Sequence, residues 1–230
     1  MSIVDRIKWS PIADSQYIRE IVPKNTIYLH HTAGNADPYS VLKWWEETPE
    51  RVATAFVIGG KPSSPSHKWT DGELVQAFSS KYWAYHLGVS KKNMPPGSAP
   101  SRQLNSQSIA IEICNWGPLE YRNGKFYSYV NSEVPKDEVI TLDNTFRSYK
   151  HWHRYTDAQI QTCKELITYL ADKYNIPTCY KGERMFHLDM RAFEGEPGIW
   201  THTSVRVDKT DCSPQPHLIE MLKEVGGTCD

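Results

Sequence analysis

The C-terminal stretch WTHTSVRVDKTDCSPQP, Trp200–Pro216, concentrates side chains that can bind a metal or move a proton. It holds a histidine, His202, followed closely by Lys209, Asp211 and Cys212. A catalytic zinc site typically takes three protein ligands of nitrogen, oxygen or sulfur type and leaves the fourth position to water. His202 with either Asp211 or Cys212 would supply two ligands, so a third must come from elsewhere in the chain.

A pair of adjacent histidines lies near the N-terminus, in the stretch TIYLHHTAGN. The apolar and β-branched residues Thr26–His31 predict a strand, and successive residues of a strand point to opposite faces. His30 and His31 therefore face opposite sides of the sheet, and at most one of them can reach a given site. Strand geometry by itself leaves both as candidates for the third ligand.

The stretch SIAIEIC, Ser108–Cys114, is the clearest strand in the sequence. Its three isoleucines share one face, so Glu112 projects from the opposite face, among small residues. A carboxylate beside a metal site can act as the general base of a hydrolytic reaction. The alternative is an ordinary exposed carboxylate on a strand.

Helical and strand periods elsewhere predict an α/β chain. The strongest helix runs from Thr156 to about Asn175, with Thr156 as N-cap and Gln159 completing a capping box. Pro38–Glu47 and Pro216–Val225 also carry apolar residues at helical spacing. Two further strands are expected at Val52–Ile58 and Glu73–Phe78. The segment between them, Lys61–Gly72, is rich in Pro and Ser and is expected to be a loop.

One domain accounts for this pattern, because 230 residues are enough to bury one sizeable core. We expect a single domain over residues 1–230 with a core at about 24–225 and loop insertions at about 89–107 and 181–198. The first insertion is polar and lacks periodicity, and the second is only weakly patterned. Long segments of this kind are usually functional or mobile.

Charge and cysteine content narrow the classes of partner. The 26 basic and 27 acidic side chains leave a formal charge of −1, so we predict no nucleic acid partner. The sequence has neither an apolar signal-peptide region nor a run of about 18 apolar residues, so we predict synthesis in the cytoplasm and no membrane insertion. Five cysteines without a CxxC pair argue against a disulfide framework and a structural zinc knuckle, and most should be free thiols.

Four motifs follow one another along the chain: LHHTAG at Leu29–Gly34, WAYHLG at Trp83–Gly88, NxxSIAIE at Asn105–Glu112, and HTSVRVDKTD at His202–Asp211. In this order they resemble the motifs of the zinc-dependent N-acetylmuramoyl-L-alanine amidases, which include AmpD-like and phage-lysozyme-like enzymes and are related to the peptidoglycan recognition proteins. The resemblance implies a single α/β domain of that type, with a mixed central sheet flanked by helices and one bound Zn²⁺.

The resemblance also implies the zinc ligands. The first histidine of the doublet, His30, and the later His202 match the family's two histidine ligands. Asp211 matches the aspartate of the KTD motif in the AmpD-like branch, where that residue binds zinc. The other branch places its cysteine ligand directly before proline, whereas Cys212 precedes Ser213. Asp211 is therefore the preferred third ligand over Cys212.

The same resemblance assigns roles beside the metal. Glu112 matches the catalytic carboxylate that shuttles a proton, and Lys209 would stabilise the oxyanion of the tetrahedral intermediate. Trp83, His86 and Asn105 are expected to line the substrate groove.

The chain departs from the phage-lysozyme-like pattern at one position. These enzymes carry a tyrosine near the second strand, and Thr54 aligns with it. Chemistry assisted by a tyrosine is therefore not expected, and Glu112 has to do more.

Together these features predict hydrolysis of the amide bond between N-acetylmuramic acid and L-alanine, in peptidoglycan or its fragments. One alternative is a peptidoglycan-binding module that does not cut. Another is a phage-type lysin with an additional protein-binding role, for which nothing in the sequence identifies the protein partner. Without a signal peptide, such a protein would reach the cell wall through a holin or an injection device.

Overall fold

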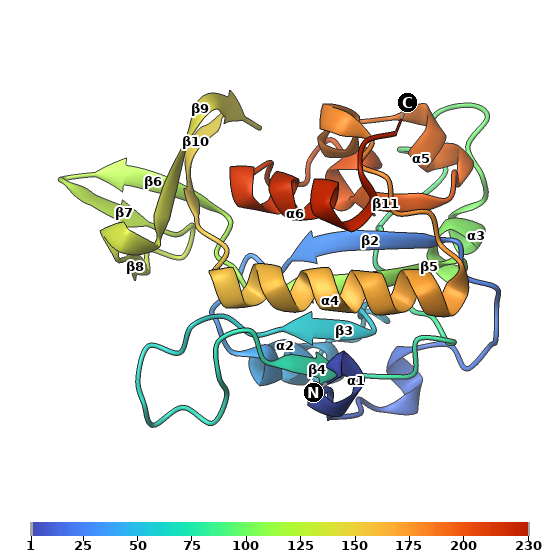
Figure 1. Ribbon diagram of the computed structural model, residues 1–230, viewed down its shortest axis with the longest axis horizontal. Helices are drawn as coiled ribbons and strands as arrows, with labels where there is room; N and C mark the ends of the chain where they lie inside the picture. The colour runs from blue at the N-terminus through green and yellow to red at the C-terminus, as the bar shows by residue number, and fades with distance from the viewer. Residues whose placement is uncertain (1, 230) are drawn as a thin grey trace.

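The computed structural model describes residues 2–229 and centres on a six-stranded sheet (Figure 1). Its strands are β1 (Lys8–Trp9), β2 (Thr26–His31), β3 (Phe56–Ile58), β4 (Leu74–Gln76), β5 (Ser108–Ile113) and β11 (Gly198–Thr201). They lie in the order β1-β4-β3-β5-β2-β11, with every neighbouring pair parallel except β3 and β4. The sheet is therefore mixed, as the resemblance to the amidases implies.

Helices cover both faces of this sheet. The helices α4 (Asp157–Tyr174) and α6 (Pro216–Gly226) pack against each other in front of it, and α2 (Pro38–Glu47) lies behind it, next to β3 (Figure 1). The predicted α/β architecture with flanking helices is confirmed. No helix within residues 2–229 combines the length and the apolar character needed to cross a membrane. The short helices are α1 (Ile3–Arg6), α3 (Ser101–Ser106), α5 (Met190–Glu194), and the 3-10 turns η1 (Asp14–Gln16), η2 (Lys136–Glu138), η3 (Gly182–Phe186) and η4 (His202–Ser204).

Local sequence signals set the ends of the main helices. At the start of α4, the Thr156 hydroxyl accepts a hydrogen bond from the Gln159 backbone and the Gln159 side chain accepts one from the Thr156 backbone. The helix ends at Asn175, whose φ of 54° is left-handed. Asp37 caps α2, which begins at Pro38.

Two predicted elements differ from the structure. The strand expected over Val52–Ile58 is limited to Phe56–Ile58, because Ala53 instead pairs with the loop residue Tyr85, to whose carbonyl its N–H donates. The aperiodic segment at 89–107 is not loop throughout, since its last part forms α3. That helix is a single short turn after Pro100, too short for its period to stand out in the sequence.

A second sheet of five strands, which the sequence analysis did not predict, projects from one end of the central sheet (Figure 1). Its strands are β6 (Pro118–Arg122), β7 (Lys125–Tyr127), β8 (Glu133–Val134), β9 (Val139–Phe146) and β10 (Tyr149–His153), in the order β8-β7-β6-β10-β9. One signal for it was present: Asn123 and Gly124, between β6 and β7, both have the positive φ that a two-residue hairpin turn requires, 52° and 77°.

The turn between β9 and β10 touches the C-terminal chemical loop. Arg147 in this turn donates hydrogen bonds to the backbone carbonyls of Val207 and Thr203, at 2.7 and 3.1 Å. The Arg147 guanidinium therefore holds in place the loop after His202, which has little regular structure. The second sheet supports the segment that leads to Lys209 and Asp211.

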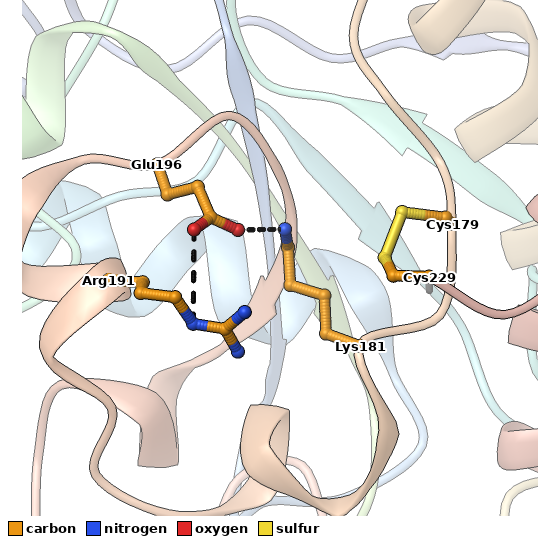
Figure 2. Close-up of a disulfide and its surroundings, with 5 residues drawn as sticks. All are labelled: Cys179, Lys181, Arg191, Glu196 and Cys229. Carbon is orange, nitrogen blue, oxygen red and sulfur yellow. Dashed lines mark hydrogen bonds and ion pairs between the residues drawn. A yellow bond between two sulfur atoms is a disulfide. The ribbon is translucent and has the colours of Figure 1, made fainter.

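The cysteines are only partly as expected. Cys114, Cys163 and Cys212 are free and buried, which agrees with the prediction that most cysteines are free thiols. Cys179 and Cys229, however, form a disulfide (Figure 2). Their separation of 50 residues hides the pair from any local sequence pattern. Closing a loop of this length stabilises a fold by about 4 kcal/mol in the chain-entropy account.

Near this disulfide, the weakly patterned segment 181–198 is held by a small charged network (Figure 2). Lys181, whose side chain is only 5% exposed, pairs with Glu196, and Arg191 lies 3.8 Å from the same carboxylate. The Lys181 ammonium also lies over the ring of Trp200 in β11, 4.8 Å from its centroid. The segment is therefore fixed against the strand that precedes His202.

Glu138 joins the second sheet to the central one. Its carboxylate lies 3.0 Å from the Lys61 ammonium, in the loop after β3, and 3.8 Å from Nε2 of His153. The contacts with His153 and Lys61 hold the pKa of Glu138 at about 2, against the opposing effect of burial. A carboxyl group whose pKa is lowered in the folded state stabilises it above its unfolded pKa, and loses this effect as the pH falls through the folded pKa.

We expect Glu138→Gln to lower the free energy of unfolding at pH 7 by less than about 1 kcal/mol, because Lys61 is half exposed. Urea unfolding of both proteins at several pH values measures this. The difference between them should shrink from the ordinary glutamate pKa, about 4.3, down to about pH 2. A difference that stays constant over this range would contradict the assigned contacts.

Candidate active site

Two histidines meet at the carboxyl ends of β2 and β11. These strands are parallel, with Leu29 opposite Thr201, so the next residues, His30 and His202, emerge at the same edge. Their Nδ1 atoms are 3.1 Å apart. The following loop brings Asp211 back to them, with its Oδ2 3.1 Å from Nδ1 of His30 and 3.0 Å from Nδ1 of His202.

These three side chains suit a zinc ion. Tetrahedral zinc, with bonds of about 2.0–2.2 Å, holds its ligand atoms about 3.3 Å apart, which is close to the separations observed. All three are buried, at 3%, 6% and 6% exposure for His30, His202 and Asp211. Two imidazoles and one carboxylate leave one tetrahedral position open, as catalytic zinc sites do.

The charge states within the cluster also suit a cation. Burial and the nearby His202 lower the pKa of His30 to about 4, so its ring is neutral at pH 7. Burial alone would raise the pKa of Asp211, but His202 and His30 hold it well below its usual range. A neutral imidazole and an ionised carboxylate are the forms that bind metal.

A chain of hydrogen bonds fixes which nitrogen of His30 carries the proton. Ser108 Oγ donates to the carbonyl of Asn105 at 3.0 Å, and that carbonyl can only accept. His86 Nε2, at 2.7 Å, must then donate to Ser108, so His86 Nδ1 accepts from His30 Nε2 at 3.0 Å. Nδ1 of His30 is left with its lone pair facing His202 and Asp211.

The second histidine is fixed in the same way. Nε2 of His202 lies 3.0 Å from the carbonyl of Leu87 and must donate to it. Its Nδ1 therefore also offers a lone pair to the cluster. Asn105 holds in place the two residues that support these histidines, His86 and Leu87. Its side-chain oxygen accepts hydrogen bonds from their backbone N–H groups at 2.9 and 3.1 Å.

Cys212 is directed away from the cluster. Its thiol is fully buried near Tyr155, and this burial raises its pKa well above the usual value. Among residues 2–229, the metal-suited group is formed by His30, His202 and Asp211, without Cys212.

The cluster opens into a cavity of about 960 Å³. Glu112 and Lys209 line it, and Glu112 lies directly opposite His30 in the pairing of β2 with β5. Burial and the neighbouring Asp211 raise the pKa of Glu112 well above its usual range, while Lys209 opposes this. A carboxyl group with a raised pKa and a lysine side chain thus share the cavity with the metal-suited cluster.

The three residues expected in the substrate groove have different surroundings. His86 lines the cavity and backs His30. Trp83 is 3% exposed, with its indole N–H donating to Glu20, and Asn105 is 1% exposed. Neither belongs to the lining of this cavity. The WAYHLG loop instead supports the two histidines from behind, a role that depends on tertiary contacts and leaves no signal in the sequence.

Two further residues that line the cavity, His31 and Thr54, have polar partners of their own. His31 lies on the opposite face from His30, and its Nδ1 is 3.0 Å from the Tyr155 hydroxyl. Thr54, where phage-lysozyme-like enzymes have tyrosine, lines the cavity, but its hydroxyl donates to the carbonyl of Phe56 at 2.9 Å.

A comparison with family profiles finds the same family that the sequence motifs resemble. Residues 22–216 match the sequence profile of N-acetylmuramoyl-L-alanine amidases, which covers most of the chain. The chain belongs to the N-acetylmuramoyl-L-alanine amidase family. A comparison of this amidase-family chain with curated proteins found no match.

Solved structures share the fold of this amidase-family chain at low sequence identity. PlyL is 15% identical with a TM-score of 0.51, over 97% of this chain and 99% of PlyL. The PlyG catalytic domain is 16% identical with a TM-score of 0.52, over 95% of this chain and 92% of that domain. AmpDh3 from Pseudomonas aeruginosa is 18% identical with a TM-score of 0.52, over 92% of this chain and 63% of AmpDh3. At such identities the likeness concerns the fold alone.

We expect His86→Phe to weaken Zn²⁺ binding about 10–100-fold, because phenylalanine fills the space but cannot accept the proton of His30 Nε2. Competition with a chromophoric chelator measures the Kd. The matched control is His67→Phe, which changes an exposed histidine outside the cavity. An unchanged Kd in His86→Phe would show that this hydrogen bond does not orient His30.

Proposed function

We propose that the protein is a zinc-dependent amidase that hydrolyses the bond between the lactyl group of N-acetylmuramic acid and L-alanine in peptidoglycan or its fragments. The observation that carries this proposal is the buried His30–His202–Asp211 cluster at the floor of a large cavity, in a chain of the amidase family. The whole chain would then be one amidase domain, with its core over residues 24–225 and insertions at 89–107 and 181–198.

In this proposal, His30 and His202 bind zinc through Nδ1 and Asp211 binds it through Oδ2. When bound, zinc would supply Lewis acidity, which polarises the scissile carbonyl and makes a water molecule acidic near neutral pH. The hydrogen bonds from His30 to His86 and from His202 to Leu87 hold both rings in the required tautomer.

Glu112 would move the proton. It faces the same cavity as the cluster and lies level with His30 on the neighbouring strand. From there the carboxyl group would accept a proton from the attacking water and pass it to the nitrogen of the leaving L-alanine.

Lys209 would stabilise negative charge on the carbonyl oxygen as that carbon becomes tetrahedral. It precedes Asp211 by two residues and lines the cavity beside it. Among the groove residues, cavity exposure supports a substrate-binding role for His86. The roles proposed for Trp83 and Asn105 are supported less directly, because they hold the loop that contains His86.

The competing function is a module that binds peptidoglycan without cutting it. The presence of all three candidate ligands, Glu112 and Lys209 in one cavity favours the enzyme. A lysin that also binds another protein is the further alternative, with delivery through a holin or an injection device after cytoplasmic synthesis. No contact within residues 2–229 identifies such a protein partner.

We expect Glu112→Ala to keep its zinc and to lose turnover by about 10²–10⁴-fold, the usual contribution of general acid–base catalysis. Metal analysis and rates of amide hydrolysis measure the two effects. Glu112→Gln serves as the control for shape, because it fills the same space without accepting the proton. Retained activity in both variants would overturn the role of Glu112.

Substrate class and reaction are tested together on the zinc-loaded protein. It is incubated separately with purified sacculi and with soluble anhydro-muropeptide, and the released ends are identified by mass spectrometry. We expect a free lactyl carboxyl group and a free L-alanine amine from at least one substrate. Binding without either product would favour the non-catalytic module.

A further inference from the structure

Large apolar side chains lie exposed in the wall of the cavity. Trp44 on α2 is 55% exposed, and Tyr129 and Val130, in the turn between β7 and β8, are 71% and 49% exposed. Most tryptophans of a folded chain are largely buried, so open rings that line a cavity mark a surface for a ligand. This surface comes from two elements that carry none of the candidate zinc ligands.

The turn that holds Tyr129 and Val130 is well ordered by its own hydrogen bonds. Ser128 and Ser132 close it, because the Ser128 N–H donates to the Ser132 carbonyl at 2.9 Å and the Ser132 N–H donates to the Ser128 hydroxyl at 3.1 Å. The side chain of Asn131 accepts a further hydrogen bond from Arg122. The backbone that carries the exposed ring is thus preorganised, and binding needs little further ordering of it.

Trp44 is fixed by its neighbour in the helix. Trp45 is 4% exposed and packs in the core of the central sheet, so the helix cannot rotate to bury Trp44 instead. Adjacent helical residues point about 100° apart, which leaves the Trp44 ring at the cavity.

The charges of the cavity are unevenly distributed, which distinguishes sugar from peptide as the occupant of the aromatic part. Arg206, Asp208, Lys209 and Asp211 lie together on the C-terminal loop, where the carboxylates of a stem peptide would find cations. The lining residues within α2 and within the β7–β8 turn are uncharged, and Glu50, three residues after the end of α2, adds one carboxylate beyond the helix. An uncharged surface with flat rings is complementary to the apolar faces of sugar rings, whose C–H groups pack on aromatic rings.

We propose that Trp44 and Tyr129 bind the glycan chain of peptidoglycan by stacking against its sugar rings, so that the polymeric wall is a better substrate than a soluble fragment with one sugar. This inference rests on the proposed amidase function. A glycan chain offers successive rings to two separate aromatic surfaces, whereas a single sugar can occupy only one of them.

The test compares kcat/KM on sacculi with kcat/KM on soluble anhydro-muropeptide for Trp44→Ala and Tyr129→Ala. We expect the sacculus-to-fragment ratio to fall about tenfold in each variant, the size expected for loss of one aromatic stacking contact. An unchanged ratio in both variants would overturn the proposal.

Tyr121→Ala is the matched control. Tyr121 belongs to the same second sheet and is 56% exposed, but it packs on Phe126 and His151 and is not part of the cavity lining. Its ratio should equal that of the unaltered protein. An equal fall in this control would mean that the sheet as a whole, and not the cavity ring, determines the preference.

Sugar and peptide are separated by competition. Peptide-free glycan strands should inhibit hydrolysis of sacculi by the unaltered protein, and should inhibit Trp44→Ala and Tyr129→Ala about tenfold less strongly. If free stem peptide shows this difference and glycan does not, the aromatic surface binds peptide and the proposal is wrong.

A binding measurement distinguishes failure of this inference from failure of the proposed function. Cosedimentation with sacculi requires no catalysis, so it tests Trp44 and Tyr129 even if the protein cuts neither substrate. Weaker sedimentation of both variants, with Tyr121→Ala unaffected, supports the glycan surface whether or not the protein is an amidase. Equal sedimentation of all four proteins would count against it.

Discussion

The parallel pairing of β2 with β5 on one side and with β11 on the other sets the geometry on which the site depends. It places His30 level with Glu112 and brings His202 out at the same edge, although these residues are far apart in the sequence. A slip of one residue in β2 would turn His30 to the opposite face and put His31 in its place beside His202 and Asp211. The register is strongly specified because β2 is buried along its whole length, so its apolar residues must stay in the core.

The ring nitrogen of His30 and of His202 that faces away from the cluster, Nε2, donates a hydrogen bond to a fixed acceptor in each case. Both supports come from the WAYHLG loop, through the His86 ring and the Leu87 carbonyl, and Asn105 ties that loop down. Burial makes these bonds important, since an unsatisfied ring nitrogen inside the protein would be costly. The loop therefore connects folding stability to the orientation of the candidate metal ligands.

The periphery of the molecule shapes what can approach this cluster. The second sheet contributes Tyr129 to the cavity wall, and its Arg147 supports the loop that leads to Lys209 and Asp211. The segment near the disulfide is fixed against β11 on the other side of His202. The second sheet thus supports the loop after His202, and the segment near the disulfide supports the strand before it.

The sequence by itself determined the elements whose signals are local: the strands that carry His30 and Glu112, the capped helix after Thr156, and the alternation that separates His30 from His31. Resemblance to a family supplied the choice of His30 and Asp211, which no period in the sequence could make. Only the tertiary structure decided how Cys179 meets Cys229, how His86 supports His30, and how the second sheet forms part of the cavity. These contacts join residues far apart in the chain, and periodicity describes only near neighbours. The distant contacts follow from strand pairing and packing, which the sequence specifies only through the whole fold.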